Sequence, residues 1–263
     1  METIVISMGG SVLFSDEIDN SYFQDFIKLI EKTSKQNKIY LIVGGGKTAR
    51  AYIKLGRNLK LNEEELDEIG IEITRVNAKM ISNIIKNSNK KIPHTTDEAI
   101  KLKEPVIIMG GTTPGHSTDM VAAELAEKTN ASKFIIATNV DGVYDKDPNK
   151  YSDAKQLKET TIQKLIDQYG TNWDAAGKNV VIDGPALEIM NRLKIPTFVL
   201  NGKKLDQLEK AFNNQIFFGT KIKKRIFSSF FILQTQGQSL SLLLLVVLVV
   251  YLLKMMLGLV QEG

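Results

Sequence analysis

The stretch that decides the fold runs from an apolar strand through a glycine-rich loop to a helix start: Ile107-Ile108-Met109-Gly110-Gly111-Thr112-Thr113-Pro114-Gly115-His116-Ser117-Thr118-Asp119. Residues 120–126 then continue as a helix. Such a loop presents backbone N–H groups and hydroxyls at a helix N-terminus, where the helix dipole favours an anionic ligand. Glycine lets the backbone approach that ligand closely. A tight turn that binds nothing has the same local pattern, so the loop alone leaves both interpretations open.

The same pattern of a buried strand followed by a polar or glycine-rich loop recurs three more times. The apolar segments are residues 3–8, 39–43 and 133–137, and helical spacing of apolar residues separates them. Strands that alternate with helices predict a mainly parallel sheet covered on both faces, a three-layer αβα sandwich. Ligands of such folds bind beyond the carboxyl ends of the strands. We therefore expect the four loops to converge on one site.

The remaining elements follow from periodicity and from helix-boundary signals. A short irregular segment starts at Ser11, and Asp183 is expected to cap a helix that has Pro185 in its first turn. A late strand is expected at residues 195–200. The other predicted helices cover residues 22–32, 47–55, 63–86, 160–168 and 205–212.

Composition excludes several classes of function. The chain has 263 residues, no cysteine and two histidines, so disulfides, thiol nucleophiles, cysteine metal sites and a histidine-rich zinc site are excluded. The net charge of +4 is small and the basic residues are scattered, so nothing indicates nucleic-acid binding. The N-terminus opens directly on a strand without a basic and apolar leader, so a cytoplasmic protein is expected.

Charged residues near the loops have two interpretations each. Lys47 and Arg50 are three apart at the start of a helix, which suits phosphate oxygens but also two solvated cations. Asp67 and Arg75 lie in the helix predicted for residues 63–86 and are expected to be surface charges. Gly70 interrupts this helix at a cost of roughly 1 kcal/mol against alanine, which indicates close packing or a ligand there.

Four motifs together resemble the amino acid kinase family, most closely its archaeal-type uridylate kinases. They are Met8-Gly9-Gly10-Ser11, Gly44-Gly45-Gly46-Lys47, the stretch from Gly110 to Asp119, and Thr138-Asn139-Val140-Asp141-Gly142-Val143-Tyr144. The resemblance covers about residues 1–225 and implies the amino acid kinase fold. It also implies transfer of the ATP γ-phosphoryl group to UMP, giving UDP for pyrimidine nucleotide biosynthesis, in a Mg²⁺-dependent hexamer. Such transfer relies on positioning and charge neutralisation and needs no strong general base, because the acceptor is already an ionised phosphate.

The resemblance further implies roles for individual residues. Lys47 and Asp119 are the catalytic candidates, and no metal ligand is named. Many family members carry a phosphate-binding lysine at the position of Ser7, so we hypothesise that Lys47 replaces part of its charge. Asp119 would organise a lysine or loop amides, or would be a plain N-terminal helix carboxylate. UMP would contact Gly45, Asp67, Thr112, Thr113, Pro114, Gly115, His116, Ser117 and Thr118. ATP would contact Gly9, Gly10, Gly46, Arg50, Thr138, Asn139, Tyr144 and Asp147.

The C-terminal residues 226–263 differ in composition from the rest. Only Lys254 and Glu262 carry charge there, and the apolar run around residues 240–260 is long enough to cross a bilayer as a helix. The segment can be a membrane anchor, a helix packed on the oligomer, or the product of a reading-frame error, and the abrupt break favours the last. We therefore divide the chain into a kinase domain, residues 1–225, and a hydrophobic tail.

Other functions stay open at this point. A non-catalytic nucleotide-binding or storage protein on the same fold is supported by the absence of a lysine at Ser7. Acetylglutamate, carbamate, aspartate and isopentenyl phosphate kinases are relatives that phosphorylate other acceptors. A membrane-bound structural role rests on the tail alone. The sequence does not decide between UMP and CMP, nor does it indicate allosteric effectors.

Overall fold

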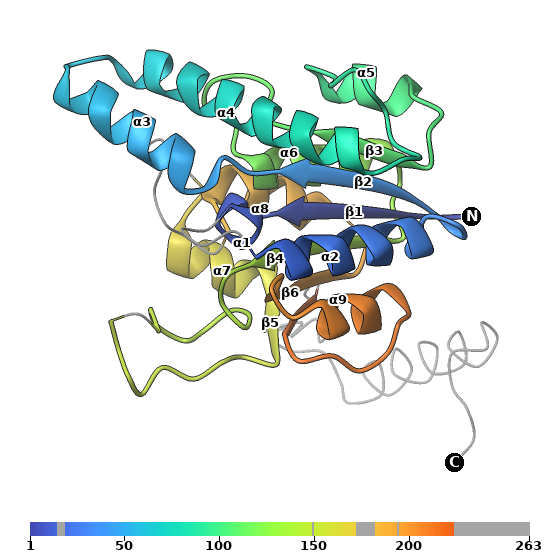
Figure 1. Ribbon diagram of the computed structural model, residues 1–263. Helices are drawn as coiled ribbons and strands as arrows, with labels where there is room; N and C mark the ends of the chain where they lie inside the picture. The colour runs from blue at the N-terminus through green and yellow to red at the C-terminus, as the bar shows by residue number, and fades with distance from the viewer. Residues whose placement is uncertain (15–18, 149, 172–181, 194, 224–263) are drawn as a thin grey trace, which may run out of the picture. The chain divides into compact units, whose positions relative to one another are not determined.

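The computed structural model describes residues 1–14, 19–148, 150–171, 182–193 and 195–223 (Figure 1). The tail predicted for residues 226–263 lies outside the described residues. The strands are β1 Glu2–Met8, β2 Asn37–Val43, β3 Val106–Met109, β4 Lys133–Thr138, β5 Glu159–Thr161, β6 Thr197–Asn201 and β7 Thr220–Lys223. The helices are α1 Gly10–Leu13, α2 Asn20–Thr33, α3 Gly46–Asn58, α4 Glu63–Ile84, α5 Thr96–Lys101, α6 Thr118–Lys128, α7 Ile162–Tyr169, α8 Gly184–Arg192 and α9 Leu205–Phe212.

The strands form one mainly parallel sheet in the order β3-β2-β1-β4-β6-β7-β5, as the alternation of strands and helices predicts. Strands β3, β2, β1, β4 and β6 are parallel neighbours, whereas β7 is antiparallel to β6 and parallel to β5. All of β3 and the last five residues of β1 and of β2 are buried. Such continuous apolar strands require cover on both faces of the sheet.

Helices supply this cover and complete the predicted three layers (Figure 1). On one face, apolar side chains of α2, α4 and α9 pack on the sheet around residues such as Phe26, Ile81 and Leu208. On the other face, α6, α7 and α8 pack around Leu125, Leu165 and Leu187. Helices α3 and α4 also pack together through Ala49, Ile53 and Leu66 and run in opposite directions (Figure 1). The core therefore consists of two apolar layers, one on each side of the sheet.

The structure differs from the sequence-based elements at the edge of the sheet. The predicted helix 160–168 starts only at Ile162, because residues Glu159–Thr161 form strand β5. Strand β7 was not predicted, although Thr220 and Ile222 are buried while Lys221 and Lys223 are exposed. Both strands are very short, and each is stabilised by pairing with the other across some 60 residues of chain. No local pattern signals such a pairing.

Two smaller expectations also change. The segment expected to be irregular after Ser11 is part of the single helical turn α1. Gly70 lies inside α4, and a methyl group added there would meet only Ile53 Cδ1 at 3.4 Å, an ordinary contact, so the close packing expected at Gly70 does not occur. No helix among the described residues is long and apolar enough to span a membrane.

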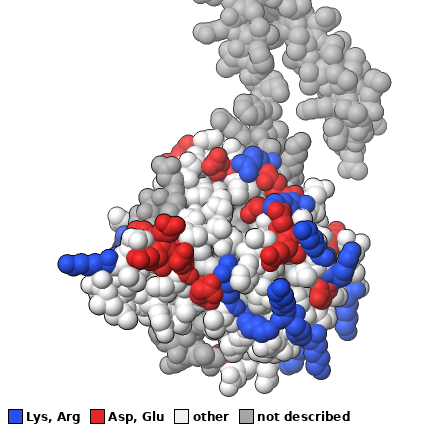
Figure 2. Space-filling model, turned by 90° about the horizontal axis from the view of Figure 1, so that it is seen from above, with Lys and Arg blue, Asp and Glu red and all other residues white. Residues whose placement is uncertain are grey.

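Charged side chains of both signs lie on the face seen in Figure 2. Lysine and arginine gather toward one side of this face with acidic residues among them, and a further acidic group lies opposite. A nucleic-acid interface needs a basic stripe or patch. The visible face therefore gives no sign of such an interface.

Candidate functional site

Backbone hydrogen bonds join three of the four loops expected to converge at the carboxyl edge of the sheet, those after β1, β2 and β4, together with the loop after β6, which was not among the four. The N–H of Gly9 after β1 donates to the carbonyl of Ala137 in β4 at 2.8 Å, and Gly44 N after β2 donates to Met8 O at 3.0 Å. On the other side of β4, Gly202 N donates to Thr138 O at 2.8 Å. The loops after β1, β2, β4 and β6 are therefore tied to one another through their backbones.

The glycine motifs after β1 and β2 are in direct backbone contact. A methyl group added to Gly10 would lie 2.0 Å from Gly46 N and 2.6 Å from the carbonyl carbon of Gly44. Gly46 also has a φ of +66°, which L side chains rarely adopt. Any side chain at Gly10 would force these two loops apart. The structure thus brings together the predicted ATP residues Gly9, Gly10 and Gly46, next to Gly45, which is predicted to contact UMP.

Helix α4 holds the glycine-rich loop that follows β3. The buried hydroxyl of Thr74 accepts the N–H of Gly111 at 2.6 Å, and Asp67 Oδ2 accepts the N–H of Gly115 at 2.7 Å. A methyl group on Gly110 would lie 2.5 Å from Thr74 Oγ1 and 2.7 Å from the backbone N of Arg75. The loop therefore lies directly against one face of α4, and Asp67, predicted as a UMP contact, lies beside it.

The same helix also holds the loop after β2. Asn77 is buried and donates from Nδ2 to Gly44 O at 2.9 Å and to Gly45 O at 3.2 Å. Arg75 was expected to be a surface charge, and that expectation is wrong. Its side chain is 15 % exposed, and its guanidinium donates to the carbonyls of Gly111 and Thr112. Sequence analysis missed Thr74 and Asn77, although buried polar residues in an apolar helix face are the available signal.

A pair of carboxylates lies between the loops and the starts of α6 and α8. Asp119, in the first turn of α6, accepts a hydrogen bond from Ser7 Oγ at 2.5 Å. Asp183 caps α8, as predicted, by accepting Ala186 N at 3.0 Å. Its other oxygen accepts a hydrogen bond from Ser117, the N-cap residue of α6. Ser7 thus donates a hydrogen bond to Asp119, which was predicted to be catalytic.

Burial makes both carboxylates hard to ionise, and repulsion by Asp183 adds to this effect for Asp119. Burial is the larger cause and the charge of Asp183 the second, and together they raise the pKa of Asp119 to about 7, against the opposing hydrogen bond from Ser7. Burial also raises the pKa of Asp183, while the hydrogen bond from Ser117 and the nearby His116 act in the opposite direction. Two close carboxylates with raised pKa values are typical of functional sites.

Two polar atoms of the loop after β3 have no hydrogen-bond partner among the described residues. They are Thr112 Oγ1 and His116 Nδ1, both buried. Buried polar atoms are normally paired, so such atoms in a loop at this edge are consistent with a ligand site. Of the other predicted residues, Thr113 and Lys47 are exposed, while Pro114, Thr118 and Arg50 are half-buried.

The loop after β4 is held by residues from late in the chain. Asp141 forms an ion pair with Lys204 at 2.8 Å and accepts Asn201 Nδ2 at 3.0 Å. The hydroxyl of Thr220 accepts Val143 N at 2.9 Å. Sequence analysis did not assign Asn201 and Lys204 to the site, although the parallel strand β6 brings its carboxyl end to the same edge.

The residues predicted for the nucleoside end of ATP are spread along this loop. Thr138 is half-buried at the end of β4, and Asn139 next to it is exposed. Tyr144 pairs in an isolated bridge with Gln156, and Asp147 lies further out and is exposed. The structure therefore places Thr138 and Asn139 beside the glycine loops, and Tyr144 and Asp147 at the outer part of the loop.

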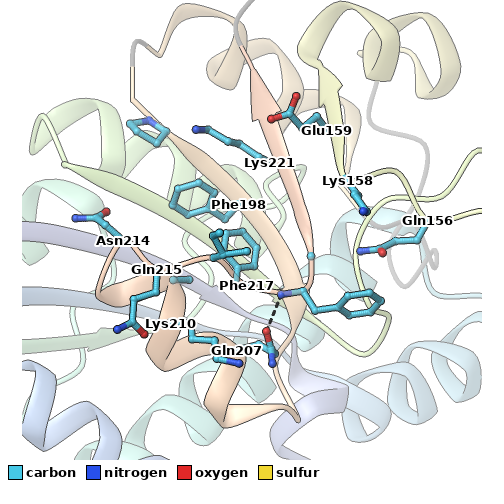
Figure 3. A pocket seen from close by; sticks show the side chains of 15 residues that line it. Gln156, Lys158, Glu159, Phe198, Gln207, Lys210, Asn214, Gln215, Phe217 and Lys221 are labelled. Atoms are coloured by element: carbon cyan, nitrogen blue, oxygen red, sulfur yellow. Dashed lines mark hydrogen bonds between the residues drawn. The ribbon is translucent and has the colours of Figure 1, made fainter.

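A groove of about 860 Å³ lies elsewhere, beside α9 and over β6, β7 and β5 (Figure 3). The rings of Phe198 and Phe217 meet there at a centroid distance of 5.1 Å, and Lys158, Lys210 and Lys221 lie around them. None of the sequence-predicted site residues lines this groove. It is therefore separate from the site formed by the loops.

Comparisons with known proteins agree with the fold and with the family that the motifs resemble. The sequence profile of the amino acid kinase family matches residues 2–201. The uridylate kinase of Thermoplasma volcanium is 43% identical over 226 residues, which cover 85% of this chain and 99% of that protein. The uridylate kinase of Methanobrevibacter smithii is 40% identical over 222 residues, with coverage of 83% and 98%.

Solved structures give the same result. The uridylate kinase structure from Archaeoglobus fulgidus has a TM-score of 0.74 and 41% identity, and the match covers 85% of this chain and all of that one. The UMP kinase structure from Ureaplasma parvum has a TM-score of 0.67 at 24% identity over 85% of this chain and 99% of that one, a likeness of fold alone. The match to the relatives extends over the region in which the four loops lie.

Proposed function

The chain belongs to the amino acid kinase family, and from this premise we propose that it is an ATP-dependent uridylate kinase. It transfers the γ-phosphoryl group of ATP to UMP and produces UDP, a step of pyrimidine nucleotide biosynthesis. The observation that carries the proposal is the joint arrangement of the loops after β2 and β3, which α4 holds side by side. That arrangement occurs in a chain about 40% identical to relatives named uridylate kinases.

The proposed mechanism rests on positioning. The backbone amides around Gly9, Gly10 and Gly46 bind the ATP phosphates, because their glycines leave the backbone accessible. Lys47 and Arg50 at the start of α3 add positive charge. Thr138, Asn139, Tyr144 and Asp147 bind the nucleoside of ATP. Holding both substrates in line accounts for most of the rate, since the acceptor oxygen is already ionised.

The acceptor UMP binds on the α4 side of the site. Gly45, Asp67 and the loop of residues 112–118 surround it in this proposal. Support comes from the unpaired Thr112 Oγ1 and His116 Nδ1, which lie in that loop. Asp67 is already oriented by the N–H of Gly115 and keeps a second carboxylate oxygen for a ligand hydroxyl.

The carboxylates of Asp119 and Asp183 fit a Mg²⁺ ion. Mg²⁺ prefers oxygen ligands and is usually bound through one or two carboxylates together with substrate phosphates. We assign Asp119 and Asp183 as the residues that hold the ion, although sequence analysis named no metal ligand. When bound, Mg²⁺ neutralises the charge that develops on the transferred phosphoryl group.

We further propose that residues 1–225 form the complete kinase domain, in a homo-oligomer that the resemblance makes a hexamer, in the cytoplasm. The relatives support the boundary, since the alignment with the Thermoplasma volcanium protein spans 99% of that protein. A non-catalytic binding role is not favoured, because relatives named uridylate kinases are about 40% identical over nearly their whole length. A different acceptor, such as isopentenyl phosphate, is the remaining alternative for the site.

The test is steady-state ADP production with ATP, Mg²⁺ and UMP, by the full chain and by residues 1–225, with CMP as the control acceptor. We expect rapid turnover that depends on UMP and is equal in both proteins. Folded, ATP-binding protein without UMP-dependent turnover would contradict the proposal, and isopentenyl phosphate is then the next acceptor to try. Activity of the full chain alone would contradict the proposed boundary.

Lys47→Ala tests the hypothesis about the missing lysine. If Lys47 replaces part of the charge absent at Ser7, the variant loses turnover more than tenfold, while an Arg57→Ala variant further along α3 does not. Unchanged turnover of Lys47→Ala rules the hypothesis out.

A further inference from the structure

Arg75 on α4 lies against the loop after β3, residues 110–118, which is called the acceptor loop below. The proposed mechanism assigns Arg75 no role. Its guanidinium donates from Nε to Gly111 O at 3.3 Å and from Nη2 to Thr112 O at 2.9 Å. The remaining Nη1 forms an ion pair with Glu72 at 2.6 Å. A planar fork that binds two successive carbonyl oxygens fixes two consecutive peptide planes.

The orientation of these planes determines where the loop N–H groups point. In a planar trans peptide the C=O and N–H bonds point in opposite directions, and the described residues contain no cis peptide. With the carbonyls of Gly111 and Thr112 turned toward Arg75, the N–H groups of Thr112 and Thr113 point away from α4. Neither N–H has a hydrogen-bond partner among the described residues. Both are therefore available as donors to a ligand or to water.

The flanking contacts of α4 do not fix these two peptides. Thr74 binds the N–H of Gly111 before them, and Asp67 binds the N–H of Gly115 after them. Loss of Arg75 therefore leaves the loop attached at both ends, while the peptides between them gain freedom to rotate. This separates the orientation of the two N–H groups from the attachment of the loop as a whole.

We propose that Arg75 is a positioning residue that presents the N–H groups of Thr112 and Thr113 to oxygen atoms of the acceptor nucleotide. The inference rests on the proposed function, because it concerns the acceptor part of that site. Phosphate oxygens and uracil carbonyl oxygens are both suitable acceptors for a backbone N–H. Cytosine has an amino donor where uracil has a carbonyl oxygen, so donors aimed at the base would discriminate UMP from CMP.

The experiment uses the full chain with Arg75→Met, which keeps the stem, and Arg75→Lys, which keeps the charge but not the fork. Glu72→Ala is the matched control, since it removes only the exposed partner of Arg75. KM and kcat are measured for UMP, CMP and ATP, together with the thermal midpoint. We expect KM for UMP to rise about tenfold in both Arg75 variants, the equivalent of one lost hydrogen bond to a charged ligand. KM for ATP should change by less than about twofold in the Arg75 variants. In Glu72→Ala, KM for UMP and KM for ATP should both change by less than about twofold.

The CMP data identify which part of the nucleotide receives the donors. If the Arg75 variants prefer UMP over CMP less strongly than the wild type does, the two N–H groups donate to the base. If KM rises by the same factor for UMP and CMP, they donate to the phosphate. An unchanged KM for UMP in both variants overturns the inference. A parallel rise of KM for UMP and ATP with a lower thermal midpoint also overturns it, because that is the result of a purely structural role. If Arg75→Met does not fold, Arg75→Lys still decides.

Failure of the proposed function is visible before any variant is made. A wild-type protein without UMP turnover would remove the proposed function and this inference together. An active wild type with unaffected Arg75 variants would overturn this inference alone.

Discussion

Two buried threonines from different parts of the chain anchor two loops of the site in the same way. One is the loop after β3, proposed to bind the acceptor; the other is the loop after β4, proposed to bind the ATP nucleoside and called the nucleoside loop below. Thr74 on α4 accepts the N–H of Gly111 at 2.6 Å and donates to Ile71 O in its own helix at 2.6 Å. Thr220 on β7 accepts the N–H of Val143 at 2.9 Å and donates to Leu157 O at 2.5 Å. In both cases one hydroxyl satisfies a loop amide and is itself oriented by a carbonyl.

The difference lies in what each anchor depends on. The carbonyl that orients Thr74 is three residues away in a continuous helix, which a capping box at Asn62 and Glu65 starts. The carbonyl that orients Thr220 is 63 residues away, and β7 exists only through its pairing with β6 and β5. The side of the site proposed for the acceptor is thus built on a locally formed helix, and the side proposed for the ATP nucleoside depends on the closure of the sheet edge. We expect the two sides to respond differently to substitution.

Gly110→Ala and Gly142→Ala are expected to have the largest effects. A methyl group on Gly110 would meet Thr74 Oγ1 at 2.5 Å and the Arg75 backbone at 2.7 Å, and one on Gly142 would meet Thr220 Oγ1 at 2.5 Å at a φ of +144°. Each should lower the free energy of unfolding by about 3 kcal/mol, from overpacking or backbone strain. Thermal and urea unfolding measure this. Gly110→Ala should raise KM for UMP more than KM for ATP, and Gly142→Ala the reverse.

Gly70→Ala is the control for both, because it lies in α4 and its added methyl would meet only Ile53 at 3.4 Å. It should stabilise the protein by up to about 1 kcal/mol through helix propensity. A destabilised Gly70→Ala would show that α4 tolerates no added methyl group, and the site-specific explanation would fail.

The pH dependence of stability tests the carboxylate pair beside the acceptor loop, in the absence of nucleotide and Mg²⁺. The folded pKa of Asp119, about 7, lies above its ordinary value of 3.8, so the folded state binds more protons between these values. The free energy of unfolding therefore falls as pH rises from about 4 to about 7. Asp119→Asn removes this loss and should be more stable than wild type at pH 8 by about 2 kcal/mol, allowing for partial solvent exposure. Parallel pH profiles of the two proteins in urea unfolding would contradict the prediction.

The matched pair Thr74→Val and Thr220→Val compares the two anchors directly. Each variant keeps the side-chain shape and leaves a loop N–H unpaired, which should cost about 1 to 2 kcal/mol in unfolding experiments. The kinetic effects should separate, with KM for UMP raised by Thr74→Val and KM for ATP raised by Thr220→Val. If KM for UMP and KM for ATP change equally in each of the two variants, the two loops move as one unit.

Lys204→Ala should have the smallest effect. Its ion pair with Asp141 is 45% exposed on the lysine side, and such pairs contribute about 0 to 1 kcal/mol. We expect KM for ATP to rise about twofold and the thermal midpoint to stay within about 2 °C of wild type. A larger rise in KM for ATP would mean that Lys204 contacts the nucleotide itself. Inorganic triphosphate would then compete with ATP less strongly in the variant than in the wild type.

Much of this molecule follows from local sequence. The apolar runs that end in Gly9, Gly44 and Gly110 specify buried parallel strands, because a strand without a polar face needs cover on both sides. Parallel strands then place their carboxyl ends at one edge, so the meeting of the loops after β1, β2, β3 and β4 was predictable without coordinates. The role of Asp183 as a helix cap was also predictable, because capping depends only on residues close to it in sequence.

Only the tertiary structure decided which residues hold these loops in place. The loop partners of Arg75, Thr74 and Asn77 lie more than 30 positions away in sequence, so even a polar residue on an apolar helix face does not show what it binds. Strands β5 and β7 are too short to be recognised without each other, and the second role of Asp183, as a partner of Ser117 and neighbour of Asp119, needs contacts between distant segments. Periodicity and capping report the few nearest residues, whereas hydrogen bonds across the fold depend on where the packed layers bring the chain together.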